Sequence, residues 1–470
     1  MVETCDVVII GAGILGCFAA RAFSAYDLKT IVLEKREDVC TMISKANTGI
    51  VYAGYDMHPG SLKAEMTVRS NGGFEQLCKE LGVTYLKTGS LMVSYGPDGD
   101  HSLASKMEQG NQNGVPGMHL ISGAQAEELE PNLKKGITSA LYSETTGAVN
   151  PWDLGIAAYE NAKANGVEFH FLEPVTGIQC QDDGVYIRTQ SNEYQAKVVV
   201  NCAGAHTDTI REMAFAPSVR IRNTSANYLV YEKGSAKQVS HVIFYEPEKN
   251  EKGLSIVPTE EGNLIIGATE SEQMNCGDYA TSTKDLSTLL SFVNTILPSL
   301  EQDRLLNQFA SVRPNPYLLQ DPEVKLNDFN ILEDGPMISL MAIKTPGITC
   351  AAELGKYIVE KVISMLGPVD KNPHYDPVRK PINHPDIEHY KIEIDGEILC
   401  RCNHVTETMV REAIHRGATT LNGVRRRTRA GMGSCQGADC EEKILKILME
   451  ELNLKAEQIT KDGAGSEVLL

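Results

Sequence analysis

The chain opens with a regular succession of apolar and amphipathic stretches. Residues 6–10 are apolar and mostly β-branched, as in a buried strand, and residues 14–25 show helical spacing without a proline. A second apolar strand, residues 30–33, ends directly before Glu34. Strand, helix and strand in this order predict a βαβ unit, and therefore a parallel sheet, at the start of the chain.

Later stretches add further strands and helices to this pattern. Apolar runs before glycine turns predict buried strands at residues 195–200 and 338–343. Alternating apolar and polar positions between residues 219 and 269 predict an antiparallel sheet. Residues 96–135 predict loops with one short helix. Helices are expected at residues 65–81, 124–129, 153–164, 286–297, 354–365, 407–416 and 441–452.

The overall composition is that of a globular protein. With 470 residues, 42% hydrophobic and 23% charged, the chain is long enough for two or three domains. Its net charge of −18 argues against non-specific nucleic-acid binding, which needs clustered cations. No run of about twenty apolar residues predicts a membrane span, and no basic segment marks a signal peptide. Twelve cysteines without a secretory signal indicate a reducing compartment, so we expect a cytoplasmic location.

The first βαβ unit carries a glycine motif, Gly11-x-Gly13-x-x-Gly16. Gly11 allows a tight turn, Gly13 lets the backbone approach a pyrophosphate, and Gly16 lets helix and strand pack closely. The helix N-terminus offers free N–H groups to the phosphates, and Glu34 can accept hydrogen bonds from ribose hydroxyls. A turn that binds nothing leaves Glu34 unexplained, so the motif predicts a dinucleotide site.

The next segment, residues 40–66, is rich in serine, asparagine, threonine and glycine, as in a stretch that wraps a cofactor. Asn47, Gly49, Gly54 and residues 59–64 match a run found in the FAD-dependent D-amino-acid-oxidase-like superfamily. Within it the chain resembles glycerol-3-phosphate dehydrogenases and L-2-hydroxyglutarate dehydrogenases most. Tyr52 stands where those families carry a histidine beside the flavin, which leaves the catalytic base unassigned.

The resemblance implies that the dinucleotide is FAD. The strand before Ala203 and Gly204 is similar to a segment that lies against FAD in the superfamily. Residues 347–349 form a turn at a helix N-terminus, which places N–H groups and a positive dipole end near the flavin. The implied FAD-binding residues are Gly11, Gly13, Ile14, Gly16, Glu34, Lys35, Ser44, Asn47, Thr48, Gly49, Val175, Ala203, Gly204, Gly347, Ile348 and Thr349.

Three residues are candidates for substrate contact and catalysis. Arg313 ends a strand-like run before two prolines, where the resembled dehydrogenases carry an arginine that faces the anionic group of the substrate. A guanidinium offers a fixed fork to phosphate or carboxylate; a surface arginine in an ion pair is the alternative. Lys344 either contacts the substrate or the flavin edge, or is solvated. Tyr52 is a candidate because it replaces the family histidine.

Four cysteines are clustered late in the chain, as Cys400-x-Cys402 and Cys435-x₄-Cys440. In a reducing compartment such a cluster usually binds metal, because disulfides would be reduced. A structural zinc more often uses two Cys-x-x-Cys pairs. The cysteine spacing and the residues around it resemble the bacterioferritin-associated-ferredoxin-like module, which implies a 2Fe-2S cluster. Zinc stays the alternative.

Four arginines between residues 425 and 429 form a basic run in this acidic chain. A solvated helix face is the default interpretation. The run also suits two other roles: balancing the charge of an anionic cluster, or docking an acidic partner.

Together the patterns and the resemblance imply a mixed fold, α/β and α+β. We expect a Rossmann-like FAD-binding domain, a substrate domain built on an antiparallel sheet, and a small helical iron–sulfur domain. The expected boundaries are residues 1–85, 146–218 and 328–366 for the FAD-binding domain, 86–145 and 219–327 for the substrate domain, 367–396 for a linker and 397–470 for the 2Fe-2S domain.

This domain order resembles the A subunits of anaerobic glycerol-3-phosphate dehydrogenases. The implied reaction oxidises sn-glycerol 3-phosphate to dihydroxyacetone phosphate, with hydride passing to FAD and electrons leaving through the cluster. The implied partners are a second flavoprotein subunit and a small cysteine-containing electron-transfer subunit. One alternative keeps the machinery but takes an L-2-hydroxy acid such as 2-hydroxyglutarate, or an amino or imino acid. Another is a non-catalytic electron-transfer subunit.

Overall fold

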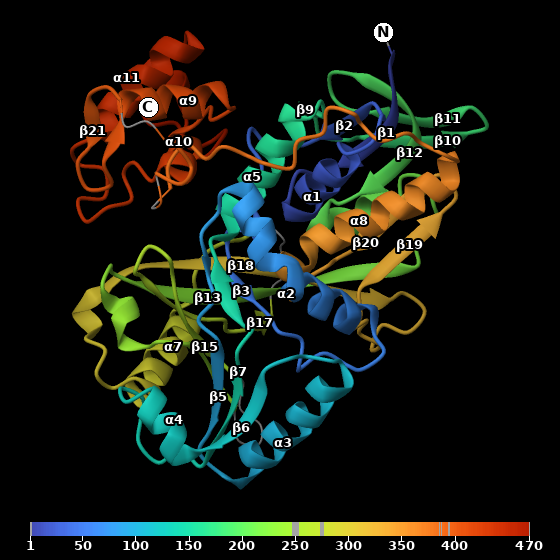
Figure 1. The fold of residues 1–470 in the computed structure, drawn as a ribbon. Helices are drawn as coiled ribbons and strands as arrows, with labels where there is room; N and C mark the ends of the chain where they lie inside the picture. The colour runs from blue at the N-terminus through green and yellow to red at the C-terminus, as the bar shows by residue number, and fades with distance from the viewer. Residues whose placement is uncertain are drawn as a thin grey trace.

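Two large sheets and a small C-terminal module make up the structure (Figure 1). The computed structural model describes residues 2–246, 253–272, 277–384, 386, 388–392 and 395–469. Among these residues no helix is both long and apolar enough to cross a membrane.

The first sheet contains the parallel strands that the βαβ pattern predicts. Its strands are β1 (Val2–Ile10), β2 (Thr30–Leu33), β9 (Glu168–His170), β10 (Gly177–Gln181), β11 (Gly184–Arg188), β12 (Glu193–Asn201), β19 (Asn330–Asp334) and β20 (Met337–Met341). Strand β1 lies at the centre, parallel to β2 on one side and to β12 on the other. Strand β20 continues the parallel set beside the end of β12.

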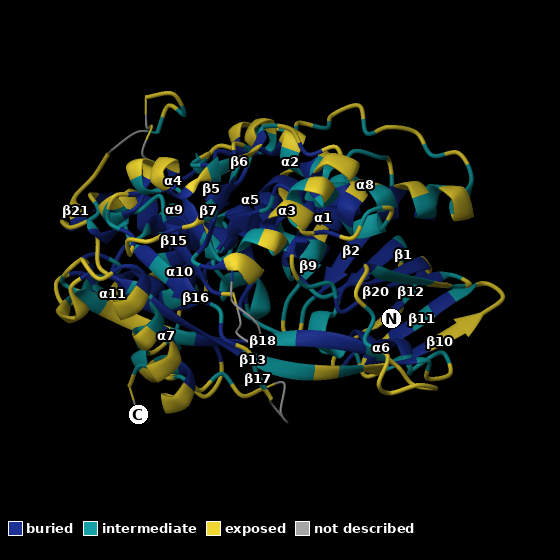
Figure 2. Ribbon diagram, turned by 90° about the horizontal axis from the view of Figure 1, so that it is seen from below, coloured by how far each residue is buried: buried dark blue, intermediate teal, exposed yellow. Residues whose placement is uncertain are grey.

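Both faces of this sheet are buried, as the continuous apolar runs predict. The helices around it are α1 (Ile14–Phe23), α2 (Leu62–Leu81), α5 (Pro151–Ala164), α6 (Thr207–Arg211) and α8 (Gly347–Leu366). Val7 and Ile9 of β1 face α1, α5 and α8, whereas Val8 and Ile10 face the β10–β11 hairpin and α6. Figure 2 shows β1 and β12 buried and the tip of the hairpin exposed.

The second sheet is the predicted antiparallel one. Its strands are β5 (Ser90–Ser94), β6 (Met118–Ser122), β7 (Ser139–Ser143), β13 (Val219–Tyr231), β14 (Val242–Tyr245), β15 (Ser255–Pro258), β16 (Leu264–Gly267), β17 (Ser271–Glu272) and β18 (Leu305–Leu318). Of its described pairings, only that of β5 with β14 is parallel. The helices α3 (Pro97–Gln112), α4 (Gly123–Leu129) and α7 (Thr283–Ile296) accompany it, and β3 (Ile50–Val51), β4 (Tyr85–Leu86) and β8 (Gly147–Val149) form a small third sheet.

Among the elements that differ from the sequence prediction, three have a clear physical reason. Helix α3 occupies a stretch predicted as loop, because its polar composition and its interior Gly99 and Gly110 hide the helical pattern. Helix α8 begins at Gly347, seven residues earlier than predicted. Strand β18 continues beyond Arg313 through Pro314 and Pro316, which is possible because it is an edge strand that pairs only with β13 among the described strands.

The C-terminal module has a hydrophobic core of its own. It contains β21 (Ile398–Cys400), β22 (Val405–Thr406), α9 (Glu407–His415), α10 (Leu421–Thr428) and α11 (Glu441–Leu452). Val410, Val424 and Leu448 from its three helices are fully buried against one another. The segment before it is anchored between residues 372 and 382: the Asn372 N–H donates to the Ala25 carbonyl oxygen at 3.0 Å, and Ile382 enters the module core.

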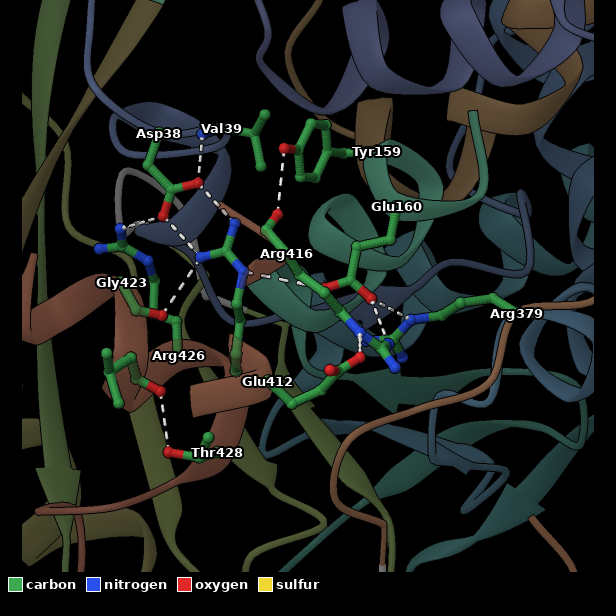
Figure 3. Close-up of polar contacts among 12 residues, drawn as sticks. Asp38, Val39, Tyr159, Glu160, Arg379, Glu412, Arg416, Gly423, Arg426 and Thr428 are labelled. Atoms are coloured by element: carbon green, nitrogen blue, oxygen red, sulfur yellow. Dashed lines mark hydrogen bonds and ion pairs between the residues drawn. The ribbon is translucent and has the colours of Figure 1, made fainter. Parts of the chain in front are cut away.

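A buried ion-pair network fixes the module to the first sheet and α5 (Figure 3). The Asp38 carboxylate, in the loop after β2, accepts two hydrogen bonds from Arg427 at 2.7 Å and one from Arg426 at 3.0 Å. Glu160 of α5 accepts from Arg379 at 2.8 Å and from Arg416 at 3.0 Å. Burial alone would raise the pKa of Asp38, but the two arginines hold that pKa below its ordinary value.

The interpretation of the arginine run as a solvated helix face is therefore wrong for Arg426 and Arg427. Their side chains are 4% and 0% exposed, and they neutralise a carboxylate of the same chain rather than one of a partner.

Candidate functional site

The predicted glycine turn connects β1 to α1 at the carboxyl edge of the first sheet. Gly11 has a φ of +98°, and a Cβ there would lie 2.8 Å from the carbonyl oxygen of Cys202. A Cβ on Gly16 would lie 1.9 Å from the Gly11 carbonyl oxygen, so helix and turn reach this contact only without side chains. The Ile14 N–H, in the first turn of α1, donates to the Ser44 hydroxyl at 2.9 Å. The turn presents the close backbone and helix terminus that a pyrophosphate requires.

A cavity of about 300 Å³ opens beside this turn. Glu34 lines it, and its carboxylate accepts from the N–H groups of Ala12 at 2.7 Å and Arg36 at 2.9 Å. Burial raises the pKa of Glu34, and these two N–H groups oppose that effect. Because each carboxylate oxygen accepts more than one hydrogen bond, Glu34 can still bind ribose hydroxyls. The other predicted FAD residues on this cavity are Gly11, Gly13, Lys35, Ser44, Val175, Ala203 and Gly204.

A second cavity, of about 550 Å³, lies between the two large sheets. Gly347 and Ile348 line it from the first turn of α8. The other predicted residues on its wall are Gly13, Ile14, Ser44, Asn47, Thr48, Tyr52, Gly204, Arg313 and Lys344. The structure thus gathers segments more than 300 residues apart around one space large enough for a flavin ring and a small substrate.

Three predicted FAD residues lie behind the cavity walls. Gly16 forms the helix–turn contact, and a Cβ on Gly49 would lie 2.0 Å from the Val149 carbonyl oxygen. The Thr349 hydroxyl, which is buried, accepts from the Tyr52 N–H at 3.1 Å. These residues shape the site by packing and by holding its loops.

Tyr52, Arg313 and Lys344 converge on the second cavity from three different segments. The Arg313 guanidinium lies 3.7 Å from a Glu270 carboxylate oxygen. Burial raises the pKa of Tyr52 well above its ordinary value, which disfavours the phenolate. The pKa of Lys344 shifts in the opposite direction: burial, with Lys325 and Arg313 nearby, lowers it to about 7. The Lys344 amine also donates to the Asn315 side-chain oxygen.

The four late cysteines come together in the C-terminal module. The Cys402 and Cys435 sulfurs are 3.6 Å apart, and Cys400 and Cys440 are both buried in the core of the module. Within the described residues, no three of these sulfurs lie within 4.8 Å of one another. A tetrahedral zinc site would hold all four sulfurs about 3.8 Å apart, whereas a 2Fe-2S cluster takes two thiolates on each iron. Two neighbouring thiolates, as at Cys402 and Cys435, suit one iron of such a cluster.

The loop between the cysteines suits a thiolate-bound cluster. Gly437 and Gly431 have positive φ, and a Cβ on Gly433 would lie 2.2 Å from the Cys402 Cβ. The Gly437 N–H, followed by neighbouring backbone N–H groups, lowers the pKa of Cys435. Such backbone donors bond cluster sulfurs and tune the potential. Cys402 is exposed whereas Cys400 and Cys440 are buried, so one edge of the site is open.

A third and larger cavity, of about 1150 Å³, separates the module from the flavin side. Gly431, Met432 and Gln436 of the cysteine loop line one wall. Asn47 and Thr48 line the cavity too, and both also belong to the second cavity. The cysteine loop and the second cavity therefore both border this cleft.

Comparison with known proteins agrees with both sites. Residues 6–361 match the model of a family described as FAD dependent oxidoreductase, and residues 398–450 match a BFD-like [2Fe-2S] binding domain. The chain belongs to the FAD-dependent oxidoreductase family. Its cofactors are FAD and a 2Fe-2S cluster.

Three similar proteins illustrate the relationship. A glycerol 3-phosphate dehydrogenase of Caloramator mitchellensis is 34% identical over 99% of this chain and 98% of its own length. An anaerobic glycerol-3-phosphate dehydrogenase subunit A1 of Haloferax volcanii is 24% identical over 99% of this chain and 86% of its own. The solved structure of an FAD-bound L-alpha-glycerophosphate oxidase from Mycoplasma pneumoniae has a TM-score of 0.74 at 24% identity, covering 80% of this chain and 98% of the other.

The structure of this FAD-dependent oxidoreductase also brings in residues that the sequence did not single out. Asn315, Lys325, Tyr228 and Glu270 lie at or beside the second cavity. Tyr228 and Glu270 line its wall from the second sheet, and Asn315 shares one face of β18 with Arg313. Because residues two apart in a strand share a face, the spacing from Arg313 was the signal that could have pointed to Asn315. No local pattern marks Lys325.

Loss of one cluster ligand is expected to remove the 2Fe-2S cluster and to leave FAD bound. Replacing Cys435 with serine should abolish the long-wavelength cluster absorbance and lower the iron content from about two per chain towards zero. FAD content should stay unchanged because the glycine turn lies in another part of the chain. Iron, sulfide and flavin analysis of the purified variant checks this, with exposed Cys180→Ser as the control. Full retention of iron in Cys435→Ser would contradict the assignment.

Proposed function

We propose that this oxidoreductase is a dehydrogenase that oxidises sn-glycerol 3-phosphate at C2 to dihydroxyacetone phosphate. The observation that carries the proposal is the set of cations at the second cavity. Arg313 and Lys344 line it, and Lys325 and Lys63 lie near Lys344. A phosphate dianion satisfies several cations at once, and the name of the Caloramator relative specifies the same substrate.

Each polar residue then has a role in the reaction. Arg313 holds the phosphate with its guanidinium fork. When bound, FAD supplies the hydride acceptor. The Lys344 amine takes the proton of the C2 hydroxyl, since its pKa, lowered to about 7, leaves roughly half of it unprotonated at neutral pH. Tyr52 packs against Phe244 and shapes the cavity. The raised pKa of its phenol makes it a poor base, so the base is assigned to Lys344.

The pH dependence of turnover should reveal this base. The pKa of Lys344 is lowered to about 7, and the reaction needs the unprotonated form. The ratio kcat/KM should therefore rise about tenfold per pH unit below pH 7 and level off above it. Steady-state assays under anaerobic conditions with an artificial acceptor measure the profile. A rate that falls with rising pH through 7 would contradict the role of Lys344.

We also propose that electrons leave through the 2Fe-2S module to a partner protein. The open Cys402 edge, and the single cleft between the cysteine loop and the flavin cavity, support this exit. The Haloferax relative is named as a subunit, which supports a complex. The expected partners are a second flavoprotein subunit and a small cysteine-containing electron-transfer subunit.

An anaerobic titration of the purified protein with sn-glycerol 3-phosphate tests the proposal. We expect the flavin band near roughly 450 nm to bleach, with cluster absorbance changing at longer wavelength. Bleaching with L-2-hydroxyglutarate instead would replace the substrate but keep the architecture. No bleaching with either compound would favour a non-catalytic electron-transfer subunit.

A further inference from the structure

Asn315 lies behind the wall of the second cavity, on strand β18 and two residues after Arg313. It is only 1% exposed, so its amide depends on partners within the protein. The amide nitrogen donates to the Thr224 hydroxyl at 3.2 Å and to the Arg313 carbonyl oxygen at 3.1 Å. The amide oxygen accepts from the Lys344 amine at 2.5 Å. Both N–H donors of the amide are therefore used, and its oxygen serves Lys344.

The direction of this amide is fixed by the groups behind it. A backbone carbonyl oxygen only accepts, so the Arg313 carbonyl requires the amide nitrogen. The Thr224 hydroxyl donates to a Glu270 carboxylate oxygen at 3.1 Å, so a lone pair of that hydroxyl, and not its proton, faces Asn315. A reversed amide would place its oxygen against two acceptors. The Asn315 oxygen is thus held toward Lys344.

The same contacts connect the two cationic side chains of the cavity. The Glu270 carboxylate lies 3.7 Å from the Arg313 guanidinium, and its other oxygen accepts from Thr224. Thr224 of β13 pairs in register with Arg313 of β18, so the chain of hydrogen bonds rests on two long paired strands. It runs from Glu270 through Thr224 and Asn315 to Lys344, while Arg313 and Lys344 both line the cavity.

We propose that Asn315 and Thr224 are positioning residues that hold the Lys344 amine as the base. An unprotonated amine has two N–H groups and one lone pair. With one N–H bonded to Asn315, the lone pair is free to point into the cavity, toward the C2 hydroxyl of a substrate whose phosphate Arg313 holds. This inference rests on the proposed function, because it assigns supporting residues to the base of that reaction.

Three cations lie near the Lys344 amine and form the background of any test by pH. Lys325 follows β18, Arg313 lies on it, and Lys63 comes from α2; with burial they lower the pKa of Lys344 to about 7. The acidic residues on the cavity wall are Asp56, Glu246 and Glu270. A change of Asn315 leaves all these groups in place. A shift of the Lys344 pKa then reports what position 315 presents to the amine.

Two opposite changes at Asn315 test the proposal in the full-length holoenzyme. Asn315→Asp offers a carboxylate, which should raise the pKa of Lys344 by about one pH unit or more. Asn315→Leu removes an acceptor that stabilises the ammonium form, so it should lower that pKa. The acidic limb of the kcat/KM profile should move up in the first variant and down in the second. A packing defect alone would not produce opposite shifts.

Chemical labelling measures the same pKa without turnover. Only the unprotonated Lys344 amine reacts with acetic anhydride, so mass spectrometry of the labelled peptide gives the midpoint pH of the reaction. We expect a midpoint at about 7 in the wild type, a higher one in Asn315→Asp and a lower one in Asn315→Leu. Asn294→Asp, at an exposed position of α7, is the matched control and should keep the wild-type midpoint.

Thr224→Val extends the test to the next residue of the chain, and covers the case in which variants of the buried Asn315 lose FAD. Valine keeps the shape of threonine but lacks the hydroxyl, so Asn315 loses one of the two contacts that orient it. We expect kcat to fall about tenfold, because the base is less well placed. KM should stay within about twofold, because Arg313 still holds the substrate.

Two results would overturn the inference. One is a pair of Asn315 variants whose labelling midpoints equal that of the wild type or move in the same direction. The other is an unchanged kcat in Thr224→Val with intact FAD. If the wild type does not oxidise glycerol 3-phosphate, the proposed function fails, whereas the labelling midpoints still decide whether Asn315 holds the amine.

Discussion

Replacing Asp38 with asparagine is expected to release the cluster module from the first sheet. The change removes the charged partner that Arg426 and Arg427 share, in a site where Asp38 is 1% and Arg427 0% exposed. Breaking a buried ion pair from one side costs about 3–5 kcal/mol. We expect about 3 kcal/mol here, because Glu160 and Asp462 still face the two arginines. Calorimetry should show the module unfolding separately, below the transition of the FAD-binding part.

Limited proteolysis gives a second measurement of the same release. Residues 367–384 are anchored by contacts such as Arg379 with Glu160, and should become accessible when the module detaches. Asp183→Asn, on the exposed turn between β10 and β11, is the matched control and should change neither result. A single transition within about 0.5 kcal/mol of the wild type would show that the network does not hold the module.

Replacing Arg313 with alanine is expected to raise the KM for glycerol 3-phosphate by about a hundredfold. Two charge-assisted hydrogen bonds to phosphate are removed, each contributing about 1.5 kcal/mol or more. FAD content should stay intact, because Arg313 lies on β18 of the second sheet, away from the glycine turn. Arg313→Lys should recover part of the affinity, since it restores the charge without the fork.

Steady-state kinetics and flavin analysis of the same preparations separate the two possible roles of Arg313. Arg304, which pairs with Glu232 at 2.7 Å just before β18, provides a matched control in Arg304→Ala. Loss of FAD in Arg313→Ala would show that Arg313 supports the cofactor. An unchanged KM would show that its contact with Glu270 is a structural ion pair and nothing more.

Features that depend on short segments could be predicted from the sequence. The glycine turn and Glu34 follow from the spacing of one βαβ unit, because each residue is required by its immediate backbone geometry. The cysteine spacing indicated a metal site, and the family resemblance of the residues around it implied a 2Fe-2S cluster. Apolar periodicity located most helices and strands, but it missed α3, whose polar residues and interior glycines give no apolar stripe.

Features that depend on residues far apart in the chain were decided only by the tertiary structure. The arginine run looked solvated because its partner Asp38 lies nearly 390 residues earlier in the chain. Strand β18 passes through two prolines because it lies at a sheet edge, a position that local sequence does not encode. Lys344 reaches the Asn315 side chain of β18 only because two segments 29 residues apart fold together. Short motifs and the family resemblance that they carry indicated the cofactors, whereas packing between distant segments set which charges are buried and which line the second cavity.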